Sequence, residues 1–287
     1  MASGRPVGLI GPLVPAGRLL AAGVGKEDTA GPAALDAPCD VGVGPLLPLP
    51  SGVGVALVTF FDADGTVDVR ATVERARRCV DLGVSSVLVA GTTGEAGRLS
   101  VDDRVELAAA VKDAAPGVAL IVGTGHAGAD DALEATAKVA AHAHADGFLV
   151  YCPADVTPDP FFRALRPEAR GRHVIAYHNP ALPGSRELRT ETVASLEVDG
   201  VKDSSASTNR LADLVELGVR VYVGSATQLM VAGPCGASGA LLALANVAPT
   251  DCIAAWNGDA AAQRRLFALH RRAARDFPSF LKDTAPR

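Results

Sequence analysis

Eight short apolar runs recur along residues 51–287 and alternate with longer amphipathic stretches. Strands of a parallel sheet have this texture, because helices cover both faces of the sheet. The runs cover residues 53–59, 86–90, 118–123, 147–151, 174–177, 200–202, 219–223 and 239–242. We therefore predict an α/β fold of the (β/α)8 TIM-barrel type, and an open doubly wound sheet is the alternative.

The intervening stretches have helical periodicity. Residues 68–82 place apolar side chains on one face, and residues 131–145 and 188–196 behave similarly. Ser100 and Asp103 have the spacing of a capping box before a further helix. No GxGxxG motif follows the first run, and the candidate reactive residues all follow the ends of runs. Both observations favour the barrel over the open sheet.

The two ends of the chain differ from this pattern. Residues 1–50 are rich in Gly, Pro and Ala without a sustained period, so we predict an irregular N-terminal arm before a single barrel domain at 51–287. Prolines and Arg18 interrupt the apolar stretch of residues 1–25, which argues against a signal peptide. The family resemblance described below implies, in addition, a shortened C-terminal helical region. In an alternative interpretation, residues 4–23 substitute for it.

Composition excludes several functional classes. The net charge is −5 and the cationic residues are scattered, so we expect no nucleic-acid partner. No run approaches the ~18 apolar residues of a membrane span, so we expect no membrane partner. Five cysteines without CxxC spacing argue against a disulfide framework and a zinc site, and fit a cytoplasmic location. No other cluster has metal-ligand spacing, so we expect no metal.

Reactive residue types follow three of the runs. Lys202 ends the sixth run, Tyr177 ends the fifth, and residues 91–95 (GTTGE) follow the second. In a barrel these positions open onto one mouth. A lysine at the end of a buried strand loses hydration, which lowers its pKa and makes its free amine a usable nucleophile. The pattern predicts Schiff-base chemistry, in which a covalent lysine imine needs no separate cofactor.

These motifs together resemble the dihydrodipicolinate synthase/N-acetylneuraminate lyase family. The resemblance covers residues 52–282 and includes GTTGE, Tyr-x-x-Pro at 177–180 and Gly-Val-Lys-Asp-Ser at 200–204. It implies a class I aldolase. Such a lyase joins a 2-oxo acid, usually pyruvate, to an aldehyde, or cleaves the product of that addition. It also implies a homo-oligomer of barrels, a dimer or a tetramer.

The resemblance, together with the residue types, implies roles for individual residues. Lys202 attacks the ketone, Tyr177 donates and accepts protons, and Thr93 passes the proton on. We expect Glu95 to anchor its loop by accepting backbone N–H groups. The loop holds the substrate carboxylate through Thr92 and backbone N–H groups. The expected substrate-binding residues are Thr92, Gly91, Gly94, Gly224, Ser225 and Leu182.

Two departures from the family bear on the substrate. Residues 152–155 read Cys-Pro-Ala-Asp where the synthases have Pro-Tyr-Tyr, so the relay is shorter, water-mediated or served by Tyr151 or Asp155. Leu182 stands where those synthases carry a carboxylate-binding arginine. We therefore favour an aldolase that forms a Schiff base with pyruvate or another 2-oxo acid and uses an aldehyde other than aspartate semialdehyde, closer to the sugar-acid aldolases. Dihydrodipicolinate synthesis and a non-catalytic oxo-acid-binding barrel remain alternatives.

Two histidines lie near the expected mouth. Alternation along the fifth run points His178 away from Tyr177, so we predict that His178 packs against a helix. His126 follows Gly125 after the third run, and we predict that it faces the mouth.

Overall fold

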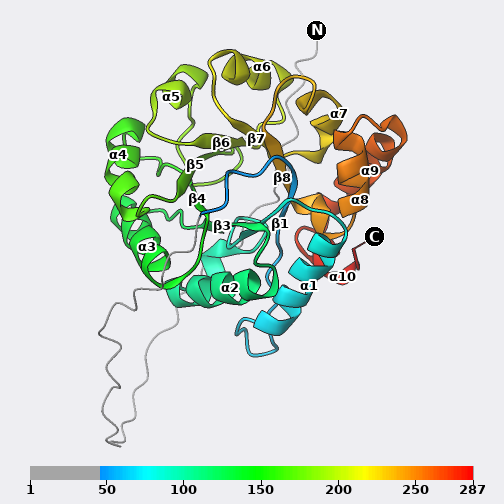
Figure 1. Ribbon diagram of the computed structural model, residues 1–287, viewed down its shortest axis with the longest axis horizontal. Coiled ribbons are helices and arrows are strands. Elements are labelled where there is room, and N and C mark those ends of the chain that lie inside the picture. Colours follow the sequence, from blue (N-terminus) through cyan, green and yellow to red (C-terminus); the bar gives the residue numbers. More distant parts are fainter. Residues whose placement is uncertain (1–45, 287) are drawn as a thin grey trace, which may run out of the picture.

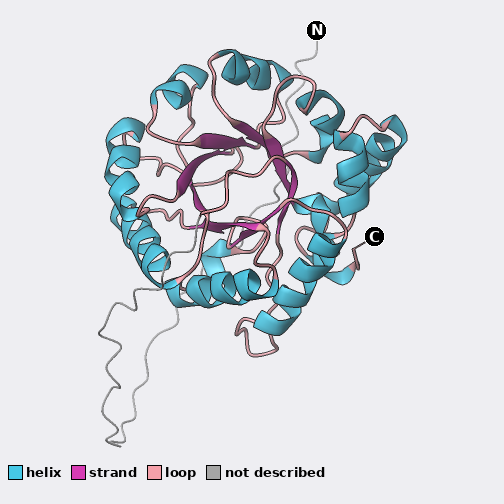
Figure 2. Ribbon diagram, viewed as in Figure 1, coloured by secondary structure: helices cyan, strands magenta, loops and turns pink. Residues whose placement is uncertain are grey.

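The fold is a closed ring of eight parallel strands surrounded by helices (Figures 1 and 2). The computed structural model describes residues 46–286. The ring closes because β1 pairs with both β2 and β8. The strands are β1 (Gly52–Ala56), β2 (Ser86–Val89), β3 (Ala119–Gly123), β4 (Gly147–Val150), β5 (His173–His178), β6 (Gly200–Asp203), β7 (Val221–Val223) and β8 (Gly239–Leu242). The predicted barrel is confirmed, and the open sheet is excluded.

The helices cover the outside of the ring (Figure 2). Asp68 and Ser100 accept hydrogen bonds from the first turns of the helices that follow them, and the predicted capping box of Ser100 and Asp103 is present. The helices are α1 (Val69–Asp81), α2 (Val101–Ala114), α3 (Ala129–His142), α4 (Pro158–Glu168), α5 (Thr190–Ser195), α6 (Thr208–Glu216), α7 (Leu229–Ala232), α8 (Pro249–Trp256), α9 (Ala260–Ala273) and α10 (Ser279–Asp283).

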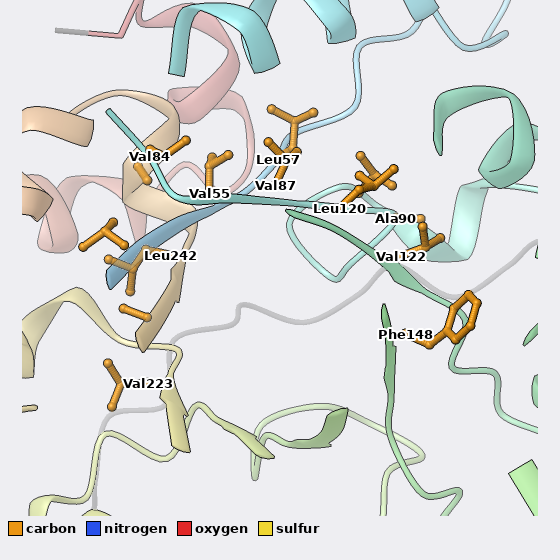
Figure 3. Close-up of a cluster of buried hydrophobic side chains, with 14 of the residues drawn as sticks. Val55, Leu57, Val84, Val87, Ala90, Leu120, Val122, Phe148, Val223 and Leu242 are labelled. Carbon is orange, nitrogen blue, oxygen red and sulfur yellow. The ribbon is translucent and has the colours of Figure 1, made fainter. Parts of the chain in front are cut away.

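Strand alternation divides the core into two layers. Outward side chains such as Val55, Val87 and Val122 pack beneath the helices (Figure 3). Inward side chains fill the ring itself, and this inner cluster comprises Ala56, Leu88, Ile121, Leu149, Ile175, Tyr177, Tyr222 and Leu241. Both faces of each strand are therefore buried, which explains why the strands read as continuous apolar runs. The same alternation points Tyr177 into the ring.

The C-terminal region is held to the barrel by a buried arginine. Arg75 of α1 donates to the carbonyl oxygens of Leu281 (2.6 Å) and Lys282 (3.0 Å) in α10. Near the N-terminal end of the described residues, Leu49 packs against the inner cluster.

The N-terminal arm is predicted at residues 1–50. Residues 1–45 of this arm lie outside the described residues, and these include residues 4–23 of the alternative interpretation. The domain boundary near residue 50 stays a prediction.

Candidate active site

A cavity of about 580 Å³ opens at the carboxyl ends of the strands. This is the end of a TIM barrel at which active sites lie. Of the nine site residues predicted from the sequence, six line this cavity: Lys202, Tyr177, Thr92, Thr93, Gly224 and Ser225. Residues from four separate strand ends therefore meet in one place, as the predicted barrel requires.

Lys202 and Tyr177 lie side by side inside the ring. They are register partners on β6 and β5, and the Lys202 Nζ atom lies 4.7 Å from the centroid of the Tyr177 ring. Lys202 is only 4% exposed. Burial lowers the pKa of Lys202 below its usual value of 10.5, and the neighbouring Tyr177 opposes this shift only in part. The neutral, nucleophilic amine is therefore more accessible here than on a surface lysine.

The Tyr177 hydroxyl lies within a group of polar side chains. Asn179 Nδ2 donates to it over 3.0 Å, and the hydroxyls of Thr92 and Ser204 also hydrogen-bond to it. Burial raises the pKa of Tyr177, but the Lys202 charge and these hydrogen bonds outweigh burial and bring the pKa below its usual value of 10. This phenol can therefore exchange its proton with a bound group more readily than a free tyrosine.

The loop after β2 brings Thr92 to this hydroxyl. We expected Thr93 in that proton-passing position. Both threonines line the cavity, but Thr92 is the one that hydrogen-bonds to Tyr177. The backbone amides of Thr92 and Thr93 donate to no other group within residues 46–286. They are therefore available to an anion in the cavity.

Neither Gly91 nor Gly94 lines the cavity, and Gly94 shapes the loop. A Cβ atom on Gly94 would lie 2.9 Å from the carbonyl oxygen of Leu57, so only glycine fits there. The carbonyl of Gly94 accepts a hydrogen bond from Thr59 Oγ1 (2.8 Å). Their expected role in substrate binding stays a prediction.

Glu95 anchors the same loop by ion pairs. It pairs with Arg98 (3.0 Å) and with Lys282 of α10. Both cations also lie over the ring of Phe61, at 3.6 and 4.9 Å from its centroid. The expectation that Glu95 accepts backbone N–H groups was wrong, because the C-terminal helix supplies a lysine that the local sequence does not reveal.

The segment after Lys202 is held by buried Asp203. Its carboxylate accepts hydrogen bonds from the Ser205 amide (2.9 Å) and from Arg210 Nε (2.5 Å). This turns the chain so that Ser204 contacts Tyr177. A Cβ atom on Gly224 would lie 2.0 Å from Ser204 Oγ, so Gly224 leaves the space that this hydroxyl occupies. Gly224 therefore acts by its lack of a side chain.

Several further expectations are corrected. Leu182 packs against the inner cluster and does not line the cavity. Neither candidate for the missing relay tyrosine, Tyr151 or Asp155, lines it either. His126 also lies outside the cavity lining, contrary to the prediction. His178 is buried outside the cavity lining and its Nδ1 accepts from the Leu188 amide (3.3 Å), in the segment before α5; its packing against a helix stays a prediction.

Sequence reasoning missed two groups of cavity residues. Asn179 and Ser204 lie within the Tyr-x-x-Pro and Lys-Asp-Ser motifs, so their proximity to predicted residues was the signal that could have found them. His270 of α9 and Phe277 belong to the second group. No motif marks them, because they reach the cavity only through the packing of the C-terminal region on the barrel.

The described part of the chain contains few other candidate sites. Among residues 46–286, no group of three or more His, Cys, Asp or Glu side chains could hold a metal ion. The cysteines at 79, 152, 235 and 252 are free. None of the described helices is long and apolar enough to cross a bilayer.

Comparison with known proteins identifies relatives of this chain. A 4-hydroxy-tetrahydrodipicolinate synthase of Corynebacterium aurimucosum is 36% identical over 229 residues, covering 75% of each chain. An uncharacterized DapA-like lyase of Halobacterium salinarum is 36% identical over 209 residues, covering 69% of this chain and 68% of its own. The crystal structure of YagE, a prophage protein from E. coli K12 in complex with pyruvate, has a TM-score of 0.72 at 26% identity. That match covers 80% of this chain and 85% of YagE. The model of the Dihydrodipicolinate synthetase family matches residues 49–274, and the chain belongs to that family.

Proposed function

We propose that this protein is a lyase that forms a Schiff base between Lys202 and a 2-oxo acid such as pyruvate. The observation that carries the proposal is the buried Lys202 amine, with its pKa lowered by burial, beside the Tyr177 phenol in a cavity. Two further facts support it. The family comprises lyases, and its relative YagE has been crystallised in complex with pyruvate.

The residues suit each step of imine formation. The neutral Lys202 amine attacks the ketone carbon and forms a carbinolamine. Tyr177 donates a proton to the carbinolamine oxygen, which leaves as water, and the C=N bond forms. The resulting iminium withdraws electrons, so a proton can leave the adjacent carbon, or a carbon–carbon bond to that carbon can break. The enamine produced then adds to an aldehyde carbonyl in the synthetic direction.

The surrounding polar groups have supporting roles. The amides of Thr92 and Thr93 are suited to hold the carboxylate of the oxo acid. Thr92, Ser204 and Asn179 contact the Tyr177 hydroxyl and are suited to return its proton. In this proposal they do without the tyrosine that the synthases supply from the Pro-Tyr-Tyr segment, which residues 152–155 lack. The proposed relay is therefore shorter than in those synthases.

Borohydride trapping tests the proposal. Incubation with pyruvate and sodium borohydride should add a stable mass to the peptide that contains Lys202. The Lys202→Ala variant should lose the adduct, because Lys202 is the one lysine among the described residues that line the cavity. Lys138→Ala is the matched control, since Lys138 is on the surface and pairs with Asp102. A wild-type protein without the adduct, or an adduct that persists in Lys202→Ala, contradicts the proposal.

Dihydrodipicolinate synthesis is the second candidate. The name of the Corynebacterium relative favours it. Against it, Leu182 occupies the place of the synthases' arginine, and none of the described cavity residues is an arginine. A coupled assay with pyruvate and aspartate semialdehyde distinguishes the two candidates. Adduct formation without turnover of any aldehyde would instead favour a non-catalytic oxo-acid-binding barrel.

A further inference from the structure

The cavity has two chemically different sides. One side carries the polar residues described above, from the loops after β2, β5, β6 and β7. The other side comes from the end of β8, the turn after it, α9 and the segment after α9. Its residues are apolar apart from His270, and they are Leu241, Ala243, Leu244, Ala273, Ala274 and Phe277. The proposed reaction uses the polar side and leaves the apolar side without a role.

The cavity offers no counter-charge for a second anion. Among the described residues that line it, Lys202 is the single Lys or Arg, and there is no Asp or Glu. Burial, and to a smaller extent the Arg271 charge, lower the pKa of His270 below 6.5, so its imidazole is neutral at pH 7. The carboxylate of the first substrate already neutralises the positive charge of the Lys202 iminium. A second carboxylate would therefore be buried without a cation.

These properties discriminate between classes of aldehyde. A carboxylate or phosphate on the aldehyde would lose hydration without gaining an ionic partner. A polyhydroxylated chain would face alanine and leucine side chains that cannot accept or donate hydrogen bonds. An apolar body would instead gain free energy by leaving water. Phe277 is 37% exposed, so a ring at the cavity is available for such a contact.

We propose that the second substrate is an uncharged aldehyde with an apolar body, such as an aryl aldehyde, seated against the apolar side of the cavity. This inference rests on the proposed Schiff base at Lys202. It also departs from the sugar-acid preference expected from the sequence, because the cavity wall supplied by α9 and Phe277 was not predictable from the motifs.

Competitive trapping tests the inference without requiring turnover. The protein is incubated with borohydride and equal concentrations of 2-oxo-4-phenylbutanoate, 2-oxoadipate and 2-keto-3-deoxygluconate, and the adducts at Lys202 are quantified by mass spectrometry. Each yield is normalised to the adduct that the same acid forms with a free lysine derivative. The phenyl adduct should exceed each of the others by at least about tenfold, because only the phenyl group matches the apolar side.

A separate incubation with pyruvate and borohydride distinguishes failure of this inference from failure of the proposed Schiff-base function. Without a pyruvate adduct, the Schiff-base function fails and the inference fails with it. A pyruvate adduct combined with equal or stronger trapping of the dicarboxylate or the polyol overturns only the inference. A pyruvate adduct without any adduct of the larger acids also overturns it, because the apolar side then binds none of them.

Two cavity variants test which residues cause the preference for the phenyl adduct. Phe277→Ala should reduce the phenyl preference, whereas Leu217→Ala should not, since Leu217 is an exposed apolar residue outside the cavity lining. Ala181→Arg places a guanidinium in the cavity wall and should shift trapping toward 2-oxoadipate. An unchanged ratio in both cavity variants would overturn the assignment of the apolar side.

Discussion

Tyr177 and Tyr222 lie on the two strands that flank β6, and both are register partners of Lys202. Both are buried in the inner cluster of the barrel. Their hydroxyls nevertheless differ. The pKa of Tyr177 lies below its usual value, whereas burial raises the pKa of Tyr222 to about 12. Among the described residues, the Tyr222 hydroxyl has no hydrogen-bond partner.

The difference comes from what surrounds each ring. The Lys202 charge acts on Tyr177 but is not among the influences on Tyr222. Thr92, Ser204 and Asn179 reach Tyr177 from the segments that follow β2, β6 and β5. Two tyrosines at matched strand positions thus acquire phenols of opposite pKa shift. The segments at the carboxyl ends of the strands make the distinction, as in other TIM barrels.

The largest expected effect comes from removing each hydroxyl in turn. Tyr177→Phe should lower kcat with pyruvate and a productive aldehyde by roughly 10²–10⁴-fold, because the acid–base group is lost. Tyr222→Phe should leave kcat nearly unchanged and raise the free energy of unfolding by about 1 kcal/mol, since a buried unpaired hydroxyl is removed. Steady-state kinetics and urea unfolding measure the two effects. Equal losses of kcat in both variants would break the comparison.

Lys202→Met tests whether the ammonium charge separates the two phenols. Tyr151 and Tyr222 have raised pKa values, so the first phenolate to form on raising the pH should be that of Tyr177. In Lys202→Met this early step should move to higher pH. Ultraviolet titration of the phenolate measures it. If the first phenolate forms at the same pH in Lys202→Met as in the wild type, the hydrogen bonds alone lower the pKa of Tyr177.

The same variant should also be more stable at neutral pH, by roughly 1–4 kcal/mol, because a buried charge is replaced by an apolar side chain. The folded-state pKa of Lys202 lies below the unfolded value of 10.5, so between these values the unfolded state binds more protons. The stability deficit of the wild type should therefore shrink as the pH rises toward 10.5. Urea unfolding at pH 7 and pH 9 tests the sign.

Gly224→Ala tests how much Ser204 contributes to the difference between Tyr177 and Tyr222. The new methyl group would displace Ser204 Oγ and remove one hydrogen bond from Tyr177 but none from Tyr222. We expect kcat to fall by about tenfold, the effect of roughly one hydrogen bond. Gly117→Ala is the control, since a Cβ atom there meets no atom within 4 Å. An active Gly224→Ala enzyme with normal kcat would exclude a role for Ser204.

The smallest expected effect concerns the loop that carries Thr92. Lys282→Ala removes the ion pair with Glu95 and the contact with Phe61. The free energy of unfolding should fall by about 1 kcal/mol, as for a partly exposed pair. Lys138→Ala, which breaks a more exposed pair with Asp102, should change stability less. If the two variants are equally stable, the C-terminal helix does not fix the loop.

Much of the fold could be predicted because a parallel barrel buries both faces of each strand. This gives every strand a local apolar signature, and the eight runs coincide with the eight strands within a few residues. The convergence of Lys202, Tyr177 and the threonine loop follows from the same prediction, since strand ends share one mouth. The sequence did not indicate that Thr92, rather than Thr93, hydrogen-bonds to Tyr177, because a turn decides which of two adjacent side chains meets Tyr177.

The amino-acid sequence by itself determined the barrel, the polar residues at its strand ends and the pairing of Lys202 with Tyr177. These depend on periodicity and on local burial, which neighbouring residues encode. Only the tertiary structure decided which hydroxyls contact Tyr177, that Lys282 pairs with Glu95, and that His270 and Phe277 close one side of the cavity. Such contacts join segments far apart in the chain, and their geometry exists only once the helices have packed on the closed ring.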